Sequence, residues 1–398
     1  MAYAEKITDD IYWIGTNDTR TALFEHVYPI PNGVSYNSYI ILDNKTALLD
    51  TADIHTATEF LANLKQALNG RSLDYLIVNH MEPDHSAVIE RVVELYPQVI
   101  IIGNAKTFTM MKQFFSFDVD AHAQTVSEGS TLDLGRHQLT FVLAPMVHWP
   151  EAMVTYDATS KTLFSADAFG TFGAIEGSIF ADGYDIGGEW LSEYRRYLTN
   201  IVGKYGKPVQ MLLKKAQGLD IQTICPLHGP IWRHNLGYII GKYDLWSRYE
   251  PECQGVLVAY ASIYGHTAEA ARLFARQLVE LGIKVKVSDI CEHHVSELVA
   301  ESFRFSHIAL FAPTYNLGLY TPVANYLHDI QALCLNNRRW VLVENGSWAP
   351  MANKHAKAIL DTMSNMQVIG EHTVKSALKE SDKTSLQALA QTLADDIR

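Results

Sequence analysis

The sequence predicts two α/β domains in tandem: a mixed α/β domain in residues 1–250 and a doubly wound parallel sheet of about five strands in residues 251–398. Three observations support this division. The chain has 398 residues, which is too long for one ordinary hydrophobic core. Its character changes at the polar, proline-containing stretch SRYEPECQG, residues 247–255. After this stretch, short apolar runs alternate regularly with helical patterns.

The first segment opens with three strand-like runs, which short polar turns connect. This arrangement predicts antiparallel pairing. The runs are IYWIGT (11–16), SYNSYIIL (35–42) and TALLDTA (46–52). Further apolar runs alternate with helical patterns such as HTATEFLANLKQAL (55–68), and we therefore expect sheets covered by outer helices. These runs are DYLIVNH (74–80), QVIIIGN (98–104), QLTFVLAPMVH (138–148), KTLFSADAF (161–169) and IQTICPLHG (221–229).

In the second segment each apolar run is followed by a helical pattern, which predicts a parallel sheet with helices on both faces. The expected strands are residues 255–261, 283–290, 307–315, 339–346 and 367–374. The expected helices are residues 268–282, 294–303, 322–333, 353–366 and 385–397. About 145 residues suit one such domain.

Composition excludes several classes of protein. The net charge of -12 argues against a nucleic-acid partner, which normally requires a basic surface. No apolar run reaches the ~20 residues that span a bilayer. The start, MAYAEKITDD, has no signal-peptide pattern. The four cysteines are scattered without a C-x-x-C pair, so we expect reduced thiols in a cytoplasmic protein that has no membrane partner.

Metal-capable side chains end four of the apolar runs: His80, His148, Asp167 and His228. Strand ends along one sheet edge lie side by side, so these residues can converge. The stretch HMEPDH adds three more candidates, Glu82, Asp84 and His85. Four imidazoles and three carboxylates are too many for one four-coordinate ion, and they suit two ions with a bridging carboxylate. Nitrogen and oxygen donors without thiolate favour iron, manganese or zinc.

Each of these residues also has an ordinary structural explanation. A histidine at a strand end is more often a hydrogen-bonded or surface residue than a ligand. Asp167 can cap a helix, and Asp84 can sit in the turn after Pro83. The joint pattern outweighs these alternatives, because independent histidines rarely all fall at the ends of buried strands.

The pattern His80-x-Glu82-x-Asp84-His85, followed by His148, Asp167 and His228, resembles the diiron site of the flavodiiron proteins (A-type flavoproteins). The resemblance implies a metallo-β-lactamase-like αββα sandwich followed by a flavodoxin-like domain. Hydrolytic members of the wider superfamily generally have a second histidine at the position of Glu82, and a carboxylate there favours iron. The resemblance further implies that one iron is held by His80, Glu82 and His148, the other by Asp84, His85 and His228, and that Asp167 bridges them.

A flavin site is expected in the second segment, where VLVAYASIYGHTAEA joins a strand to a helix that starts near Ala268. Backbone N–H groups and hydroxyls at a helix N-terminus bind anions, and the loop lacks the P-loop lysine and G-x-G-x-x-G signatures. It resembles the phosphate loop of flavodoxins, which bind FMN, although a plain turn of small residues is an alternative. Two further loops, residues 312–318 and 344–350, follow the strands expected at the switch point.

Trp348 is expected to stack on or shield the flavin ring, because a broad aromatic face suits a flat ring system. A partly buried loop tryptophan is the alternative. The candidate FMN-binding residues are Ser262, Ile263, Tyr264, Gly265, His266, Thr267, Pro313, Thr314, Tyr315, Asn316, Leu317, Gly318, Asn345, Gly346, Ser347 and Trp348.

The resemblance implies an oxidoreductase that reduces dioxygen to water, nitric oxide to nitrous oxide, or both. The four electrons held by two irons and a reduced flavin match either reaction. It also implies a head-to-tail homodimer or a dimer of dimers and a separate electron donor, rubredoxin first, with a reduced deazaflavin as an alternative. Two other functions stay open, a binuclear zinc hydrolase carrying a flavodoxin domain and an electron carrier with a vestigial metal domain. The sequence does not decide between the two gases.

Overall fold

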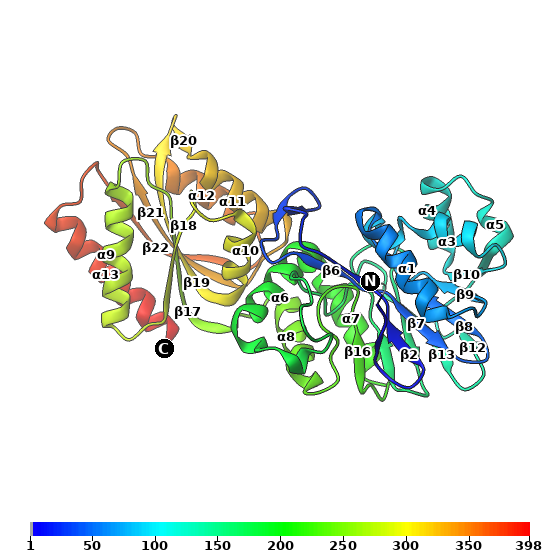
Figure 1. Ribbon diagram of the computed structural model, residues 1–398. Helices are drawn as coiled ribbons and strands as arrows, with labels where there is room; N and C mark the ends of the chain where they lie inside the picture. The colour runs from blue at the N-terminus through cyan, green and yellow to red at the C-terminus, as the bar shows by residue number, and fades with distance from the viewer. Residues whose placement is uncertain (1–2) are drawn as a thin grey trace. The chain divides into compact units, whose positions relative to one another are not determined.

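The computed structural model describes residues 3–398, which form two compact units (Figure 1). The first unit comprises Met1–Leu198 and Lys207–Asp244, and the second comprises Thr199–Gly206 and Leu245–Arg398. Each unit contains its own sheets and its own buried apolar residues.

Two sheets build the first unit. The seven-stranded sheet has the order β1-β2-β7-β8-β9-β10-β11, and the five-stranded sheet has the order β12-β13-β14-β15-β16. The expected antiparallel pairing of the opening runs is confirmed, since β2, β7 and β8 pair in this way. The bounds are β1 Glu5–Lys6, β2 Ile11–Trp13, β7 Tyr39–Leu42, β8 Thr46–Leu49, β9 Tyr75–Ile77, β10 Ile100–Gly103, β11 Ala123–Thr125, β12 Thr131–Asp133, β13 Gln138–Leu143, β14 Met153–Asp157, β15 Thr162–Phe164 and β16 Thr223–Cys225.

The sheets of the first unit pack face to face. Leu49, Ile77 and Ile102 of the seven-stranded sheet share one buried cluster with Phe141 and Phe164 of the five-stranded sheet. Figure 1 shows α1 (Ala57–Leu68) and α4 (Ala105–Phe114) over the seven-stranded sheet and α7 (Gly206–Ala216) near β16. The predicted αββα sandwich is therefore confirmed. Two further sheets have two strands each: β3 (Thr16–Asp18) pairs with β6 (Val34–Tyr36), and β4 (Leu23–Phe24) pairs with β5 (Tyr28–Pro29).

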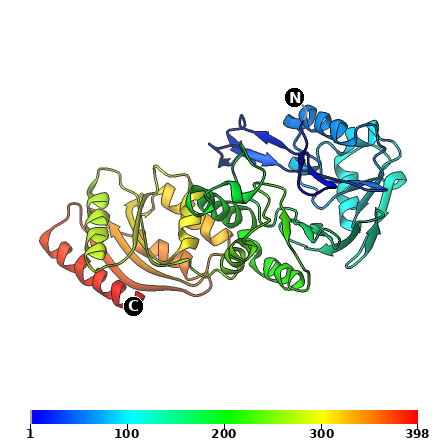
Figure 2. The same ribbon diagram turned by 60° about the horizontal axis from the view of Figure 1, so that its bottom comes forward.

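The second unit contains a parallel sheet of the order β18-β17-β19-β21-β22, and the predicted doubly wound sheet is confirmed. Helices α10, α11 and α12 pack on one face, and α9 and α13 pack on the other, where Figure 2 shows α13 (red) beside α9 (yellow-green). The strand bounds are β17 Cys253–Tyr260, β18 Val285–Asp289, β19 Phe305–Tyr315, β21 Arg338–Asn345 and β22 Met366–Val374. The helix bounds are α9 His266–Glu280, α10 Val295–Arg304, α11 Thr321–Ala332, α12 Ala352–Leu360 and α13 Glu380–Ile397.

The chain reverses its direction of strand addition between β17 and β19, because β18 lies on the other side of β17. Ligands of such sheets bind outside the carboxyl ends of the strands at this switch point. Among residues 3–398, no helix combines the length and the apolar character needed to cross a membrane.

A buried histidine links the two sheets of the first unit. His137 lies just before β13, and its Nδ1 is 2.7 Å from Oδ2 of Asp157 at the end of β14. Its Nε2 is 3.2 Å from Oδ2 of Asp10, which precedes β2 of the other sheet. The hydrogen bond to Asp157 raises the pKa of His137. Burial opposes ionisation of Asp157, but His137 and Ser160 outweigh it and lower the pKa of that carboxyl.

We therefore predict that replacing this imidazolium, in His137→Gln, makes the melting temperature less sensitive to pH. Because the pKa of His137 is raised on folding, its stabilising effect is complete below its unfolded pKa of about 6.5 and is lost as the pH rises through the folded value. The difference in melting temperature between wild type and variant should be largest near pH 6 and should shrink by pH 9. Metal-loaded protein is used so that ligand histidines do not titrate.

His55→Gln is the matched control, since the His55 side chain is 72% exposed and also pairs with an aspartate, Asp53. It should leave the pH profile unchanged, because exposed ion pairs contribute little to stability. A wild-type and a His137→Gln curve that stay parallel from pH 6 to 9 would contradict the prediction.

Candidate metal and cofactor sites

The seven candidate ligands come together at one end of the first unit, on loops that follow strands of both sheets. β9, β13, β15 and β16 end three to five residues before His80, His148, Asp167 and His228, respectively. The expectation that these residues share the edge of one sheet was wrong, because β9 belongs to the seven-stranded sheet and the other three strands to the five-stranded sheet. The loops converge because the two sheets are packed face to face.

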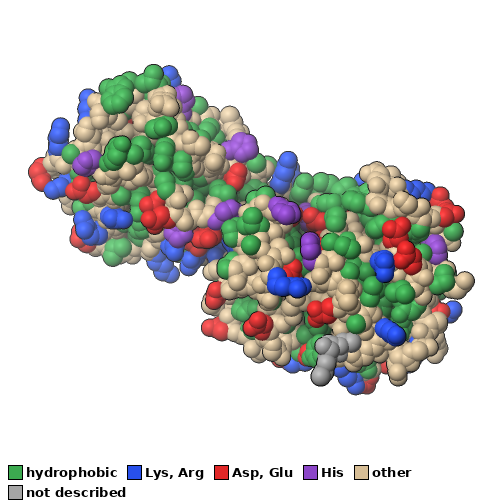
Figure 3. Space-filling view, turned by 45° about the horizontal axis from the view of Figure 1, so that its top comes forward, with side chains coloured by type: hydrophobic (Ala, Val, Ile, Leu, Met, Phe, Trp, Pro, Cys, Tyr) green, Lys and Arg blue, Asp and Glu red, His purple; other side chains and the backbone are tan. Residues whose placement is uncertain are grey.

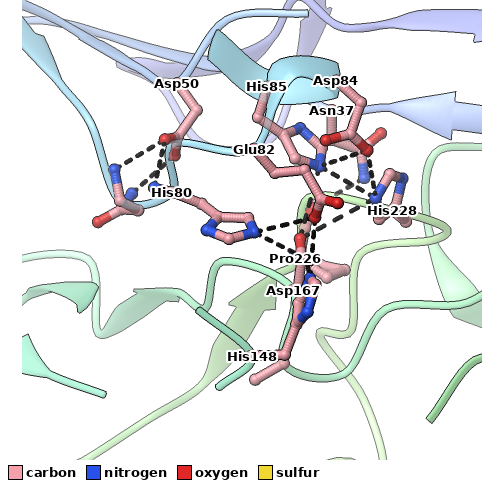
Figure 4. Close-up of polar contacts among 12 residues, drawn as sticks. Asn37, Asp50, His80, Glu82, Asp84, His85, His148, Asp167, Pro226 and His228 are labelled. Carbon is pink, nitrogen blue, oxygen red and sulfur yellow. Dashed lines mark hydrogen bonds and ion pairs between the residues drawn. The ribbon is translucent and has the colours of Figure 1, made fainter. Parts of the chain in front are cut away.

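The first ligand group consists of His80, Glu82, His148 and Asp167 (Figure 4). Oε2 of Glu82 lies 3.2 Å from Nε2 of His80 and 2.9 Å from Nε2 of His148. Oδ2 of Asp167 lies 3.4 Å and 3.0 Å from the same two nitrogens. Four donor atoms therefore surround one point.

The second ligand group consists of Asp84, His85 and His228. Asp84 and His85 lie on the short helix α2 (Pro83–Ser86), which Glu82 precedes. Oδ2 of Asp84 is 3.3 Å from Nε2 of His85 and 3.3 Å from Nε2 of His228, and these two nitrogens are only 3.0 Å apart.

Asp167 faces both groups. Its Oδ2 is directed toward His80 and His148, and its Oδ1 lies 3.5 Å from Nε2 of His85 and 4.0 Å from Nε2 of His228. A carboxylate with one oxygen toward each of two groups has the geometry of a bridging ligand.

The ionisable groups shift one another's pKa. Burial lowers the pKa of His148, but hydrogen bonds to Asp167 and Glu82 outweigh it and raise the pKa to about 9. Burial also lowers the pKa of His80, but the charge and hydrogen bond of Asp167 outweigh burial and raise this pKa well above its ordinary value. Burial alone would raise the pKa of Asp167, yet its histidine neighbours hold it far below the usual range. The Asp167 carboxylate thus stays ionised among the buried histidines.

The donor set fits two metal ions. Both carboxylate oxygens of Asp84 and Oδ1 of Asp167 are buried without a hydrogen bond, although such atoms are costly to leave unpaired. Two ions would satisfy these oxygens and would also separate the close Nε2 atoms of His85 and His228. Imidazole and carboxylate donors suit iron, manganese or zinc.

Several residues behind the ligands were missed by sequence reasoning. Oε1 of Glu151 lies 2.9 Å from Nδ1 of His80, and Nδ1 of His228 lies 2.7 Å from the backbone oxygen of Ser35. Asp50 accepts from the backbone N–H groups of Asn79 and His80. Asp50 ends the apolar run TALLD, so the signal used for the ligands was present there too. At Asp50 this signal marks a residue that holds the backbone of the His80 loop and is not itself a ligand.

Three aromatic rings enclose His228. The ring centroids of Phe24, Tyr36 and Tyr197 lie 5.5, 5.8 and 5.4 Å, respectively, from that of His228. The buried hydroxyl of Tyr197 has no hydrogen-bond partner. Burial, assisted by the charge of Asp167, raises the pKa of Tyr197 well above its ordinary value, so the hydroxyl keeps its proton. Their sequence positions did not indicate that these aromatic residues lie beside the ligands.

In the second unit, the three loops expected to bind FMN follow β17, β19 and β21, which are neighbouring parallel strands. The first loop is held by Ser262, whose Oγ accepts the N–H of Gly265 at 3.0 Å. Gly265 has φ of +93°, a conformation that glycine adopts without strain, and α9 begins at His266, two residues earlier than expected. Residues 262–267 thus lie at the N-terminus of a 15-residue helix.

The second loop is a tight hairpin, because β19 pairs with β20 (Gly318–Leu319) across Asn316 and Leu317, both with positive φ. Thr314 Oγ1 accepts the backbone N–H groups of Met351 and Ala352 at 2.9 and 3.1 Å, which fastens the third loop to the second. All three loops therefore lie at the carboxyl ends of the strands next to the switch point.

Exposed aromatic side chains gather in these loops. Tyr264 is 90% exposed and Trp348 is 78% exposed, with Tyr315 also exposed. Figure 3 shows hydrophobic side chains (green) open to solvent on the second unit, at the left. Large apolar groups this exposed indicate a ligand or partner surface. The alternative to a flavin-stacking role, a partly buried loop tryptophan, does not describe the exposed side chain of Trp348.

Comparisons with known proteins agree along nearly the whole chain. Residues 34–229 match the model of a family described as "ODP family beta lactamase". An uncharacterized protein of Methanocaldococcus jannaschii is 32% identical over 391 residues, which cover 98% of each chain. A protein of Moorella thermoacetica named nitric oxide reductase is 31% identical over 357 residues, 89% of this chain and 88% of its own.

Solved structures give the same picture. The rubredoxin:oxygen oxidoreductase of Desulfovibrio gigas matches with a TM-score of 0.91 and 27% identity, over 99% of this chain and 98% of its own. The flavodiiron protein of Giardia intestinalis shares the fold, with a TM-score of 0.94 and 23% identity over 100% and 97% of the two chains.

From the position of Asp167 we predict that Asp167→Asn lowers metal content from two ions per chain to one or none, because the neutral amide cannot bridge two cations. Metal analysis after dialysis measures the outcome. Asp9→Asn, at a side chain that is 91% exposed, is the control and should keep both ions. Full metal content in Asp167→Asn would show that this carboxylate is not a shared ligand.

Proposed function

The chain belongs to the flavodiiron protein family, and from this membership we propose that it is an oxidoreductase that reduces dioxygen to water, nitric oxide to nitrous oxide, or both, with FMN and two iron ions. The observation that carries the proposal is Asp167, whose two carboxylate oxygens face two separate groups of buried ligands. The same chain presents three loops at the switch point of a parallel sheet.

In this proposal one iron is held by His80, Glu82 and His148, the other by Asp84, His85 and His228, and Asp167 is shared. When bound, two ferrous ions and reduced FMN supply the four electrons that reduction of one dioxygen molecule requires, and two of them suffice to couple two nitric oxide molecules. The residues of the chain fix the donor atoms, exclude bulk water and provide protons. A hydrolase would have no need of the three loops of the second unit.

The geometry offers Tyr197 as a proton donor. Its hydroxyl is buried, protonated and without a hydrogen-bond partner, and its pKa responds to the charges of Asp167, Asp84 and Glu82. A phenol in this position can donate to an oxygen or nitrogen atom on which negative charge develops.

FMN is assigned to the three loops of the second unit. Residues 262–267 would bind its phosphate with backbone N–H groups and hydroxyls at the start of α9. Residues 313–318 and 345–348 would contact the isoalloxazine ring, with Trp348 as the stacking or shielding side chain.

The relatives suggest the partners. The Desulfovibrio gigas protein is named as an oxidoreductase of rubredoxin and oxygen, and the Moorella thermoacetica protein as a nitric oxide reductase. We propose rubredoxin as the electron donor of this chain and a head-to-tail homodimer, alone or paired with a second dimer, as its assembly.

The test combines cofactor content with turnover. Protein loaded anaerobically should contain two irons and one FMN per chain. With one reduced donor it should consume dioxygen or nitric oxide in two separate assays, each started by adding one of the gases. The ratio of the two rates identifies the preferred gas. Zinc with ester or thioester hydrolysis, or a flavin that cycles without gas consumption, would overturn the proposal in favour of the hydrolase or the electron carrier.

We predict that Tyr197→Phe lowers the turnover number for gas reduction by about 10-fold or more, because the variant loses only the proton-donating hydroxyl. Iron and FMN content should stay at wild-type levels. Tyr238→Phe, on α8 (Leu236–Ser247), is a matched control away from the ligands and should keep full activity. Unchanged turnover in Tyr197→Phe would remove this residue from the mechanism.

We predict that Thr267→Val weakens FMN binding by about 10-fold, since it deletes one hydroxyl near the expected phosphate and keeps the side-chain shape. Fluorescence titration of the flavin-free protein with FMN gives the dissociation constant. Thr321→Val, at the first residue of α11, is the matched control and should bind FMN normally. Equal affinities of wild type and Thr267→Val would exclude a contact between this hydroxyl and the phosphate.

A further inference from the structure

The two ligand groups differ in the hydrogen-bond partners of their histidine Nδ1 atoms, which point away from the ligand site. Glu151 is fully buried, as is His80, and its Oε1 lies 2.9 Å from Nδ1 of His80. The same oxygen accepts the backbone N–H of Met81 at 2.8 Å. Both contacts hold the carboxylate at the Nδ1 edge of the imidazole, opposite the Nε2 atom that faces the ligand group.

Among residues 3–398, no carboxylate forms a hydrogen bond with Nδ1 of either histidine of the second group. Nδ1 of His228 contacts the backbone oxygen of Ser35 at 2.7 Å, and Nδ1 of His85 is buried without a hydrogen-bond partner. Asp50 interacts electrostatically with His85, but the hydrogen bonds to its carboxylate come from the backbone N–H groups of Asn79 and His80 and from the side-chain amide of Asn79.

The ligand atoms of the two groups match in kind, and Glu25 forms a hydrogen bond with Glu82 beside the first group. Each group has two histidines, one carboxylate of its own and one oxygen of Asp167. A carboxylate that accepts the outer N–H of a ligand histidine fixes the ring and makes the inner nitrogen a stronger donor. The added negative charge also stabilises the higher oxidation state of the bound ion. Glu151 therefore acts on one metal position only.

We propose that Glu151 makes the two metal positions unequal, so that the ion held by His80, Glu82 and His148 binds more tightly and is oxidised first. Glu151 is a positioning residue, since it acts through His80. The inference rests on the proposed diiron function and deepens it by assigning an order to the two irons. In an oxidative titration with ferricyanide, each ferricyanide removes one electron from one ferrous ion, and the ion of the first group becomes ferric before the other.

The test loads metal-free protein anaerobically with one equivalent of ⁵⁷Fe²⁺ and then one equivalent of ⁵⁶Fe²⁺, and records the Mössbauer spectrum. In the wild type, one ferrous doublet should dominate, because the first ion fills the tighter position. Anomalous diffraction from crystals with one iron per chain should place that ion at His80, Glu82 and His148. The doublet should also be the first to convert to a ferric signal when ferricyanide is added.

Glu151→Gln keeps the size of the side chain and an oxygen that can accept the same two N–H groups, but it removes the charge. It should weaken the tighter position by roughly 10- to 100-fold in a chelator competition, so that ⁵⁷Fe²⁺ distributes over two doublets. Glu94→Gln, at a side chain that is 59% exposed on α3 (Ile89–Leu95), is the control and should load as the wild type does.

Several results would overturn the inference: two equal doublets in the wild type, a first ion at Asp84, His85 and His228, or Glu151→Gln that loads and oxidises as the wild type does. The wild-type loading order and diffraction decide the matter even if the variant fails to fold. Two irons that bind equally would overturn this inference and leave the proposed function intact, whereas protein that binds no iron would overturn both.

Discussion

The structure depends on an electrostatic constraint, which is that three carboxylates and four imidazoles share a small volume from which water is largely excluded. Ionised carboxylates in such surroundings require compensating positive charge. The histidines provide some of it, as their raised pKa values show, but Asp84 keeps two oxygens without a hydrogen bond. Two metal ions meet this requirement, and Asp167 is placed to serve both.

The fold meets this constraint by fixing backbone segments from both sheets. Asn37 donates to the backbone oxygens of Pro226 and Gly229 and so holds the loop of His228, while its own side-chain oxygen accepts from Trp13 Nε1 (Figure 4). Thr51, which follows β8, donates twice to the backbone oxygen of His85 and so holds the ligand loop that follows β9. Because each loop is fastened through its backbone, the ligand side chains can approach one another closely without distorting the sheets.

The alternation of apolar runs and helical patterns predicted the parallel sheet of the second unit. The side chains at strand ends, together with the HMEPDH stretch, predicted the seven residues that come together. The sequence pattern placed the ligands on one sheet edge, because a linear pattern does not reveal which runs pair with which. β14 was missed, since its run MVTYD directly follows the loop of His148 and has no turn signal before it. Glu151 and Tyr197 could not be identified from spacing, because only the folded chain brings them to the ligands.

The charge of this donor set supports the proposed redox function over hydrolysis. Two divalent ions would carry four positive charges against the three negative charges of Glu82, Asp84 and Asp167, which would leave about one positive charge. Oxidation of both ions by one electron each would raise this to about three, which a buried site stabilises only if further negative charge is close. Glu151 supplies that charge behind His80. With a neutral imidazole in place of Glu82, the centre would be more positive by one charge in every state, and oxidation would be correspondingly less favourable.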